Sequence, residues 1–291
     1  MKCVIPTAGY GTRLFPATRA IPKIFFPVVD IDGLAKPIIQ IIVGEAISSG
    51  VDEICIVTQK DQLEAIRNYF SESTIPFSKE EADRCLAEII QMGKRISYVI
   101  QDNPEGFGHA VYCARDFVGK EPFLLLLGDH IYISNTQVPC SKQVIDAFQR
   151  YGVSVTSVAR THESQLKFFG AVNGKWVGER TLEVDLLKEK PDVDYARANL
   201  EVEGLSAGTY LCNFGIDVLT SEIFDVIGYN IRNNIRQRGE FQLRDAMETL
   251  MEREGLYAQE VDGQRHDIGI PEEFVRTVAS FGLRAYPKAA G

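Results

Sequence analysis

A glycine loop with two cations close behind it is the first part of the sequence whose residue types could do chemistry. Gly9 and Gly11 follow a short apolar run, and Arg13 and Lys23 come soon after them. Glycines let the backbone approach a ligand closely and turn N–H groups toward phosphate oxygens. The planar Arg guanidinium and the compact Lys ammonium both suit phosphate. The loop therefore indicates a phosphate-binding site, with an ordinary tight turn beside solvated cations as the alternative.

The amino-acid sequence disfavours two common types of nucleotide-binding loop. The dinucleotide fingerprint needs a third glycine three residues after the second, where this chain has Leu14. The P-loop string G-x-x-x-x-G-K-S/T occurs nowhere in the chain. A dinucleotide-dependent oxidoreductase and a P-loop NTPase therefore both lose support.

An aspartate after a fully apolar run could hold a metal ion. Asp129 closely follows the run 123–127, and His130 comes next. Ligands of α/β sheets bind beyond the carboxyl ends of the strands, which is where Asp129 is expected. Mg²⁺ is commonly held by one or two carboxylates together with substrate phosphates. We therefore expect Mg²⁺ at Asp129 and a structural role for His130, with a simple turn or helix cap as the alternative for the acid.

Strand-length apolar runs alternate with segments of helical period in the first half of the chain. The expected strands are 2–6, 53–58, 96–101, 123–127 and 153–158. The expected helices are 37–49, 62–70, 79–92 and 108–117. This alternation predicts a Rossmann-like, doubly wound and mostly parallel α/β sheet with helices on both faces.

The second half has a different pattern. Short strand-like segments with Gly and Asn between them are expected at 168–172, 181–187 and 208–213, and helices at 220–227, 241–253 and 271–281. These predict a mixed or antiparallel portion that covers the parallel half. Because the chain shows neither a linker nor a repeat, we expect one domain, 1–291, with two lobes that meet near residue 160.

The composition and charge of the chain indicate which kinds of partner and which cellular compartment to expect. The chain has 291 residues, 45% of them hydrophobic, and a formal net charge of -9. An acidic surface disfavours nucleic-acid and anionic-membrane partners, although cations gathered in one cleft could still bind phosphates. The six cysteines are far apart and form no C-x-x-C pair. They predict reduced core cysteines in a cytoplasmic protein, and no apolar run approaches the length of a membrane span.

The string from Gly9 to Lys23, G-x-G-T-R-x-x-P-x-T-x-x-x-P-K, resembles the signature of the sugar-nucleotide pyrophosphorylases. The resemblance implies a glycosyltransferase-A-like nucleotidyltransferase fold and nucleotide contacts from Ala8, Gly9, Gly11 and Thr12. It also implies that Arg13 stabilises the leaving pyrophosphate and that Lys23 lies on the phosphates nearby. Lobe 1–160 would then bind the nucleotide. Lobe 161–291, which contains the C-terminal helices, would bind the sugar phosphate.

A second matching segment begins at Gln101 and continues through residues 105–110, E-G-F-G-H-A. It is similar to the segment with which uridylyl- and thymidylyltransferases read the pyrimidine, and 108–114 resembles the bacterial glucose-1-phosphate uridylyltransferases in particular. The resemblance implies that Gln101 and the Gly106 backbone bind the base edge. A glutamine amide suits this role because it offers both a donor and an acceptor to an imide.

The remaining matches concern the sugar phosphate and the metal. Glu189 and Lys190 match an E-K-P element that implies contacts to sugar hydroxyls and to the sugar phosphate. Gly170 and Gly208 are similar to glycines whose backbone approaches the sugar. Asp267 lies in a segment similar to the family's late D-x-G-T/I-P element, which implies a second metal carboxylate.

Together the matches predict a Mg²⁺-dependent enzyme whose partners are a nucleoside triphosphate and a sugar 1-phosphate, and a homo-oligomer is possible. UTP and glucose 1-phosphate are the expected substrates. The segment 30–37 is longer than the D-K-P turn of the uridylyltransferases, so a thymidylyltransferase or another sugar-1-phosphate nucleotidyltransferase stays open. A catalytically silent regulatory subunit is the other alternative. The presence of Arg13, Lys23 and both acids disfavours it.

Overall fold

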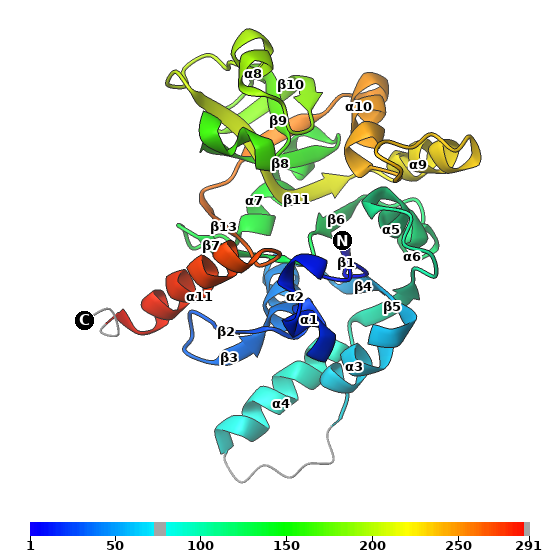
Figure 1. Cartoon of the computed structure of the whole chain (residues 1–291), viewed down its shortest axis with the longest axis vertical. Helices are drawn as coiled ribbons and strands as arrows, with labels where there is room; N and C mark the ends of the chain where they lie inside the picture. Colours follow the sequence, from blue (N-terminus) through cyan, green and yellow to red (C-terminus); the bar gives the residue numbers. More distant parts are fainter. Residues whose placement is uncertain (73–79, 288–291) are drawn as a thin grey trace.

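One mixed sheet of nine strands runs through the computed structural model, which describes residues 1–72 and 80–287 (Figure 1). The strand order is β5-β4-β1-β6-β11-β8-β12-β10-β9. The strands are β1 (Lys2–Pro6), β4 (Glu53–Thr58), β5 (Ile96–Ile100), β6 (Phe123–Leu126), β8 (Val155–His162), β9 (Ala171–Trp176), β10 (Thr181–Lys188), β11 (Thr209–Leu219) and β12 (Tyr257–Glu260). Two small sheets pair β2 (Pro27–Val29) with β3 (Ala35–Pro37), and β7 (His130–Ser134) with β13 (Gly263–Asp267).

Helices flank the sheet. They are α1 (Ala17–Ala20), α2 (Ile38–Ser48), α3 (Lys60–Phe70), α4 (Glu80–Gly93), α5 (Phe107–Cys113), α6 (Arg115–Val118), α7 (Cys140–Tyr151), α8 (Val193–Asn199), α9 (Glu222–Arg232), α10 (Leu243–Glu254) and α11 (Pro271–Ala285). Short 3-10 turns form η1 (Thr12–Leu14), η2 (Lys23–Phe25) and η3 (Glu163–Phe168). Within the described residues, no helix is both long and apolar enough to span a bilayer.

The two halves of the sheet pair differently, as the sequence predicted. β5, β4, β1 and β6 form parallel pairs, whereas β11 runs antiparallel to both β6 and β8. Beyond β11, the pairs of β10 with β12 and β9 are antiparallel, and only β8–β12 is parallel in this part of the described sheet. The parallel strands are buried on both faces, which is why they read as continuous apolar runs.

Alternate residues of β1 pack into two separate core layers. Cys3 and Ile5 lie in the layer that includes Ile38 of α2. Val4, between them, lies in the opposite layer, which includes Val111 of α5. The period of two along a strand sends neighbouring side chains to opposite faces, so a doubly wound sheet needs apolar residues at every position. Helices on both faces of the parallel half are therefore confirmed.

The C-terminal helix returns to the first half of the chain. In Figure 1, α11 (red) lies beside β2 and β3 (blue). Phe274 of α11 makes an edge-on ring contact with Phe26, at a centroid distance of 5.6 Å. Tyr286, just after α11, donates its hydroxyl to the Gly33 carbonyl at 2.9 Å. The expected boundary near residue 160 therefore does not divide the chain into two spatially separate halves, because 271–285 packs with the first.

Most expected elements agree with the structure within a few residues, and the differences have local causes. The expected helix 108–117 is divided into α5 and α6 at Ala114. The expected strand 168–172 begins in η3, and β9 itself starts at Ala171 and extends to Trp176. In the expected helix 79–92, Lys79 lies outside the described residues, and α4 covers the rest.

Candidate active site

The carboxyl ends of β1 and β6 lie side by side because the two strands are parallel neighbours. The glycine loop leaves β1 at this edge, and Asp129 follows β6. A Cβ on Gly128 would lie 2.4 Å from the Pro6 carbonyl oxygen, so only glycine allows the two strand ends to approach this closely. This close approach places Asp129 next to the loop, at the edge where α/β sheets bind ligands.

The glycine loop closes around Lys23. Gly11 has φ 63°, a left-handed conformation that favours glycine, and a Cβ there would lie 2.9 Å from Thr18 Cγ2 and 3.4 Å from Lys23 Cδ. The Lys23 ammonium lies 2.6 Å from Oδ2 of Asp129. The Ala8 carbonyl, on the other side of the loop, accepts a hydrogen bond of 2.5 Å from Gln59 Nε2. Lys23 therefore pairs with the proposed metal ligand in this structure.

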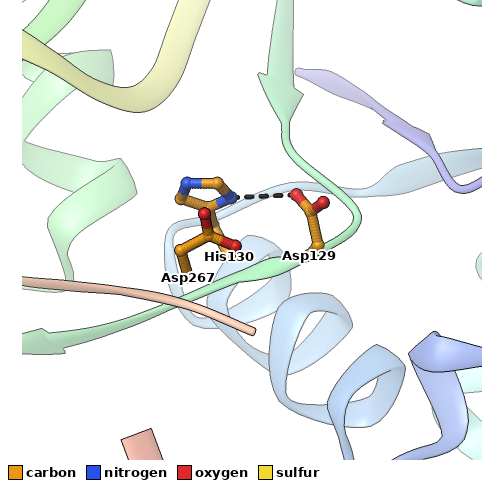
Figure 2. Close-up of side chains that lie close together, drawn as sticks. All are labelled: Asp129, His130 and Asp267. Atoms are coloured by element: carbon orange, nitrogen blue, oxygen red, sulfur yellow. Dashed lines mark hydrogen bonds and ion pairs between the residues drawn. The ribbon is translucent and has the colours of Figure 1, made fainter. Parts of the chain in front are cut away.

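Asp129, His130 and Asp267 form a candidate metal centre (Figure 2). The oxygen and nitrogen atoms that they offer all lie within 4.8 Å of one another. The antiparallel pairing of β7 with β13 sets His130 opposite Asp267, and the Ile268 amide donates to the Asp129 carbonyl at 2.9 Å. Two acids that are far apart in the sequence thus meet because two short strands pair.

The residues around these acids fit a metal ion. Gly269 donates its amide to Oδ1 of Asp267 at 2.6 Å. A Cβ on Gly269 would lie 2.9 Å from that oxygen, 3.1 Å from Oδ2 of Asp129 and 3.3 Å from Nη2 of Arg13. A side chain at this position would fill the space between the two carboxylates and Arg13. Carboxylate oxygens are the donors that Mg²⁺ prefers, so the donor set also fits.

The surroundings of Asp129 keep it ionised. Burial would raise the pKa of the carboxyl, but the Lys23 ammonium and the hydrogen bond from His130 outweigh burial and hold that pKa well below its usual range. His130 Nδ1 lies 2.9 Å from Oδ1 of Asp129. Asp129 is therefore a carboxylate at neutral pH, which is the form that binds a cation. His130, expected to be structural, hydrogen-bonds this carboxylate and lies within the candidate metal centre.

A cleft of about 250 Å³ opens beside the metal centre. It is lined by Arg13, Phe107, Leu127, His130, Phe168, Phe169, Gly170, Glu189, Lys190, Asn213, Gly215, Gln242, Leu243, Arg244, Arg265 and Asp267. A wider pocket of about 700 Å³ shares Arg13, Lys190 and Asp267 with it. Four of the lining residues carry a positive charge, so this acidic protein gathers cations where phosphates would bind.

The far side of the cleft brings together the residues expected to bind the sugar. A Cβ on Gly170 would lie 2.6 Å from Nδ2 of Asn213 and 2.9 Å from Oε2 of Glu189, so this backbone faces both side chains closely. Lys190 has φ 46°, which is uncommon for a residue with a side chain, and its ammonium lies 3.5 Å from Glu189. Lys190 follows strand β10 by two residues and lines the cleft.

Gly208 does not line the described cleft, contrary to the expectation from sequence. Its carbonyl accepts a hydrogen bond of 2.9 Å from the Glu163 amide, and the glycine lies just before β11. Gly215, later in β11, lines the cleft instead and has φ 100°. The register of β11 against β8 shifts between Asn213 and Asp217, and this irregularity turns the Gly215 backbone toward the cleft.

Gln101 lies at the end of β5, buried and 4% exposed. Its Nε2 lies 3.3 Å from the Gly106 carbonyl and 3.0 Å from Nδ1 of His109. Gly106 has φ 116°, and Phe107 after it lines the cleft. The structure therefore brings Gln101 and Gly106 together beside Phe107, although neither of them is among the residues that line the described cleft.

The cleft residues that the sequence analysis missed include the polar residues Asn213, Arg265 and Arg244. Asn213 is 7% exposed, and its Oδ1 is buried without a partner among the described residues. Arg265 lies over the Phe169 ring at 3.7 Å and donates to the Asn213 carbonyl. Arg244 pairs with the buried Asp217 at 3.4 Å. All three come from strand or helix positions without a motif, so only the fold reveals them.

A match to a family model over nearly the whole chain shows which protein family it belongs to. The family model described as "Nucleotidyl transferase" matches residues 2–281. The chain belongs to the nucleotidyl transferase family. That match covers the glycine loop, both acids of the candidate metal centre and the cleft between them.

Within this family, the chain is similar to enzymes and structures named for UDP-glucose synthesis. UTP–glucose-1-phosphate uridylyltransferase 1 of Staphylococcus saprophyticus is 36% identical over 290 residues, which cover 97% of this chain and 93% of that protein. A crystal structure of UDP-glucose pyrophosphorylase complexed with UDP-glucose aligns with TM-score 0.80, 28% identity and coverage of 97% and 98%. The UTP-bound enzyme of Acinetobacter baumannii aligns with TM-score 0.78, 27% identity and coverage of 99% and 94%. The expected nucleotidyltransferase fold is confirmed.

Proposed function

We propose that this nucleotidyl transferase makes UDP-glucose and pyrophosphate from UTP and glucose 1-phosphate, with Mg²⁺ as its cofactor. The observation that carries the proposal is the meeting of Asp129, Asp267, Arg13 and Lys23 around the glycine loop. Such a set of carboxylates and cations suits a transfer between phosphates. The likeness to uridylyltransferases over 97% of the chain supports uridine and glucose as the nucleoside and the sugar.

The reaction is an exchange at the α-phosphorus of UTP. A phosphate oxygen of glucose 1-phosphate forms a bond to that phosphorus, the bond to the bridging oxygen of the β-phosphate breaks, and pyrophosphate leaves. The attacking phosphate is already anionic at neutral pH, so no general base is needed. Mg²⁺ held by Asp129 and Asp267 would supply charge neutralisation for the phosphates.

The residues of the glycine loop bind and orient the triphosphate. The backbone of Ala8, Gly9, Gly11 and Thr12 would present N–H groups to the nucleotide. Arg13, exposed in η1, would stabilise the charge that develops on the leaving pyrophosphate. Lys23 would lie on the phosphates nearby, since its ammonium already faces the metal centre at Asp129.

The residues of the far side would hold the second substrate. Lys190 would hold the phosphate of glucose 1-phosphate, and Glu189 would accept hydrogen bonds from sugar hydroxyls. The Gly170 backbone would approach the sugar, because a Cβ there would meet Asn213 and Glu189. Asn213, with its buried and unpartnered Oδ1, is a further candidate for a sugar hydroxyl.

A pyrophosphate-release assay over several nucleotides and sugar 1-phosphates tests the proposal. We expect the highest kcat/KM with UTP and glucose 1-phosphate. A preference for dTTP would favour the thymidylyltransferase alternative. A protein that binds UTP but releases no pyrophosphate with any sugar phosphate would be the silent regulatory subunit, and the proposal would then be wrong.

A further inference from the structure

The side chain of Gln101 is held in one orientation by two neighbours. Its Nε2 lies 3.3 Å from the Gly106 carbonyl oxygen and 3.0 Å from Nδ1 of His109. A backbone carbonyl can only accept a hydrogen bond, so the atom that faces Gly106 must be the amide NH₂ of Gln101. The same NH₂ then donates its second proton to His109. The Gly106 contact therefore identifies which atom of the amide is the nitrogen, and both contacts hold it there.

The bond from Gln101 in turn sets the state of His109. Because Nδ1 accepts a hydrogen bond, it carries no proton, and the neutral ring has its proton on Nε2. That nitrogen lies 3.7 Å from Oε2 of Glu105 and 4.0 Å from Sγ of Cys113. A carboxylate beside Nε2 favours a proton at this nitrogen. The surroundings of His109 therefore select the same tautomer from both sides of the ring.

A loop before α10 holds Glu105 in place. Arg236 Nη2 donates to Oε1 of Glu105 at 2.5 Å, and the Arg236 guanidinium lies 3.9 Å from the centroid of the Phe241 ring. The Phe241 amide donates to the Glu105 carbonyl at 2.9 Å, and its own carbonyl accepts from the Gly108 amide at 2.8 Å. Contacts from a distant segment thus support the chain of contacts Arg236–Glu105–His109–Gln101.

This arrangement leaves the carbonyl oxygen of Gln101 for the base. Among residues 1–72 and 80–287, no side-chain or backbone donor is paired with that oxygen. An acceptor matches the ring N–H of a uracil or thymine imide, whereas the same position in cytosine is a second acceptor. The orientation of one amide therefore distinguishes UTP from CTP.

We propose that His109, as a neutral imidazole protonated on Nε2, is a positioning residue that directs the Gln101 carbonyl toward the base and so makes the enzyme prefer uracil to cytosine. The inference rests on the proposed function, because it needs a pyrimidine nucleotide at Gln101. His109 itself contacts Gln101 and not the substrate.

Two variants of His109 test the proposal by the ratio of kcat/KM for UTP to that for CTP. His109→Asn keeps an oxygen near the place of Nδ1, so its ratio should stay close to that of wild type. His109→Leu should lower the ratio about tenfold through KM for UTP, with kcat at saturating UTP little changed.

Cys113→Ala is the matched control, since it removes the other neighbour of Nε2 without changing Gln101, and its ratio should equal that of wild type. A His109→Leu enzyme with the wild-type ratio, in a wild type that prefers UTP, would overturn this proposal alone. A wild type that prefers a purine nucleotide would overturn the proposed function as well. If His109→Leu does not fold, His109→Ala takes its place, and a wild-type ratio in that variant counts against the proposal.

Discussion

Asp129 connects the glycine loop to the metal centre, because its two carboxylate oxygens face Lys23 at 2.6 Å and His130 at 2.9 Å. Asp129→Asn keeps the size of the side chain but removes its charge. We expect turnover to fall by roughly 10²–10³ while the fold is retained. Pyrophosphate release at saturating Mg²⁺, compared with thermal unfolding of the same sample, measures both effects. Full activity of Asp129→Asn in the presence of EDTA would contradict the metal assignment.

Lys190 is the residue for which substrate binding and a merely solvated charge predict the most different experimental results. Its side chain is 42% exposed, and it pairs only loosely with Glu189 at 3.5 Å. If it holds the sugar phosphate, Lys190→Ala should raise KM for glucose 1-phosphate and lower kcat/KM, while UTP binding to the free enzyme barely changes. Steady-state kinetics for both substrates, together with a UTP titration, measure this difference.

Lys188 is the control for Lys190. It lies two residues away, lines a neighbouring pocket but not the cleft, and places its ammonium 5.5 Å from the centroid of the Tyr195 ring. Lys188→Ala should leave both KM values close to those of wild type, and its stability should change by about 0.5 kcal/mol or less. Equal, small effects at both lysines would show that Lys190 does not bind the sugar phosphate.

The loop between β13 and α11 restricts residue size next to both acids of the candidate metal centre. A methyl group on Gly269 would lie 2.9 Å from Oδ1 of Asp267 and 3.1 Å from Oδ2 of Asp129. Gly269→Ala should therefore displace the carboxylates or fill the metal position, and kcat/KM should fall roughly a hundredfold.

Gly282 of α11 gives a matched control for Gly269, since a Cβ there meets nothing within 4 Å. Gly282→Ala should keep full activity and unfold at the same or a higher temperature, because alanine favours a helix over glycine. The assay is kcat/KM together with the apparent affinity for Mg²⁺. An active Gly269→Ala enzyme with unchanged Mg²⁺ affinity would show that the metal does not bind in this space.

Elements with a continuous apolar run were predictable from the sequence, and those defined by their partners were not. β1 and β4 were predicted to the residue because strands buried on both faces are apolar throughout. β13 was missed because Gly263–Asp267 reads Gly-Gln-Arg-His-Asp, and its extended form depends on pairing with β7. α7 was also missed, although Val144, Ile145 and Ala147 form an apolar stripe on its buried face.

The site shows the same limit. A motif predicted Asp129 and Asp267 as a pair, and the structure brings their oxygen atoms within 4.8 Å. Gly208 and Gly215 are both followed by residues with a strand-like sequence pattern. Only the register shift in β11 shows which of the two glycines faces the cleft. The contact of His109 with Gln101 joins α5 to the residue after β5, and the sequence alone does not determine such a contact.

Four of the six cysteines are buried, which fits the expectation of core cysteines. Cys3, Cys55, Cys140 and Cys212 are buried and all six cysteines are free, whereas Cys85 and Cys113 are partly exposed. Burial raises the pKa of Cys55 to about 12 and that of Cys212 to about 11. Because the thiolate is the reactive form, a raised pKa makes these thiols unreactive at pH values well below it. The cytoplasmic location expected from the sequence stays a prediction.

A thiol titration at about pH 8, slightly below the ordinary cysteine pKa, checks this picture of the core. We expect Cys85 and Cys113 to react first and the four buried thiols to react only when the protein is unfolded. Mass spectrometry of the labelled peptides identifies the sites. Rapid labelling of Cys55 in the native protein would show that the sheet opens more readily than its packing indicates.

The fate of the phosphates of UTP tests the central claim most directly. The protein is incubated with glucose 1-phosphate, Mg²⁺ and UTP that carries a label on either the α- or the γ-phosphate. Attack at the α-phosphorus predicts that the α label appears in UDP-glucose and the γ label in pyrophosphate, in equal amounts and only when Mg²⁺ is present. Release of the γ label as inorganic phosphate, or its transfer to the sugar, would contradict the account.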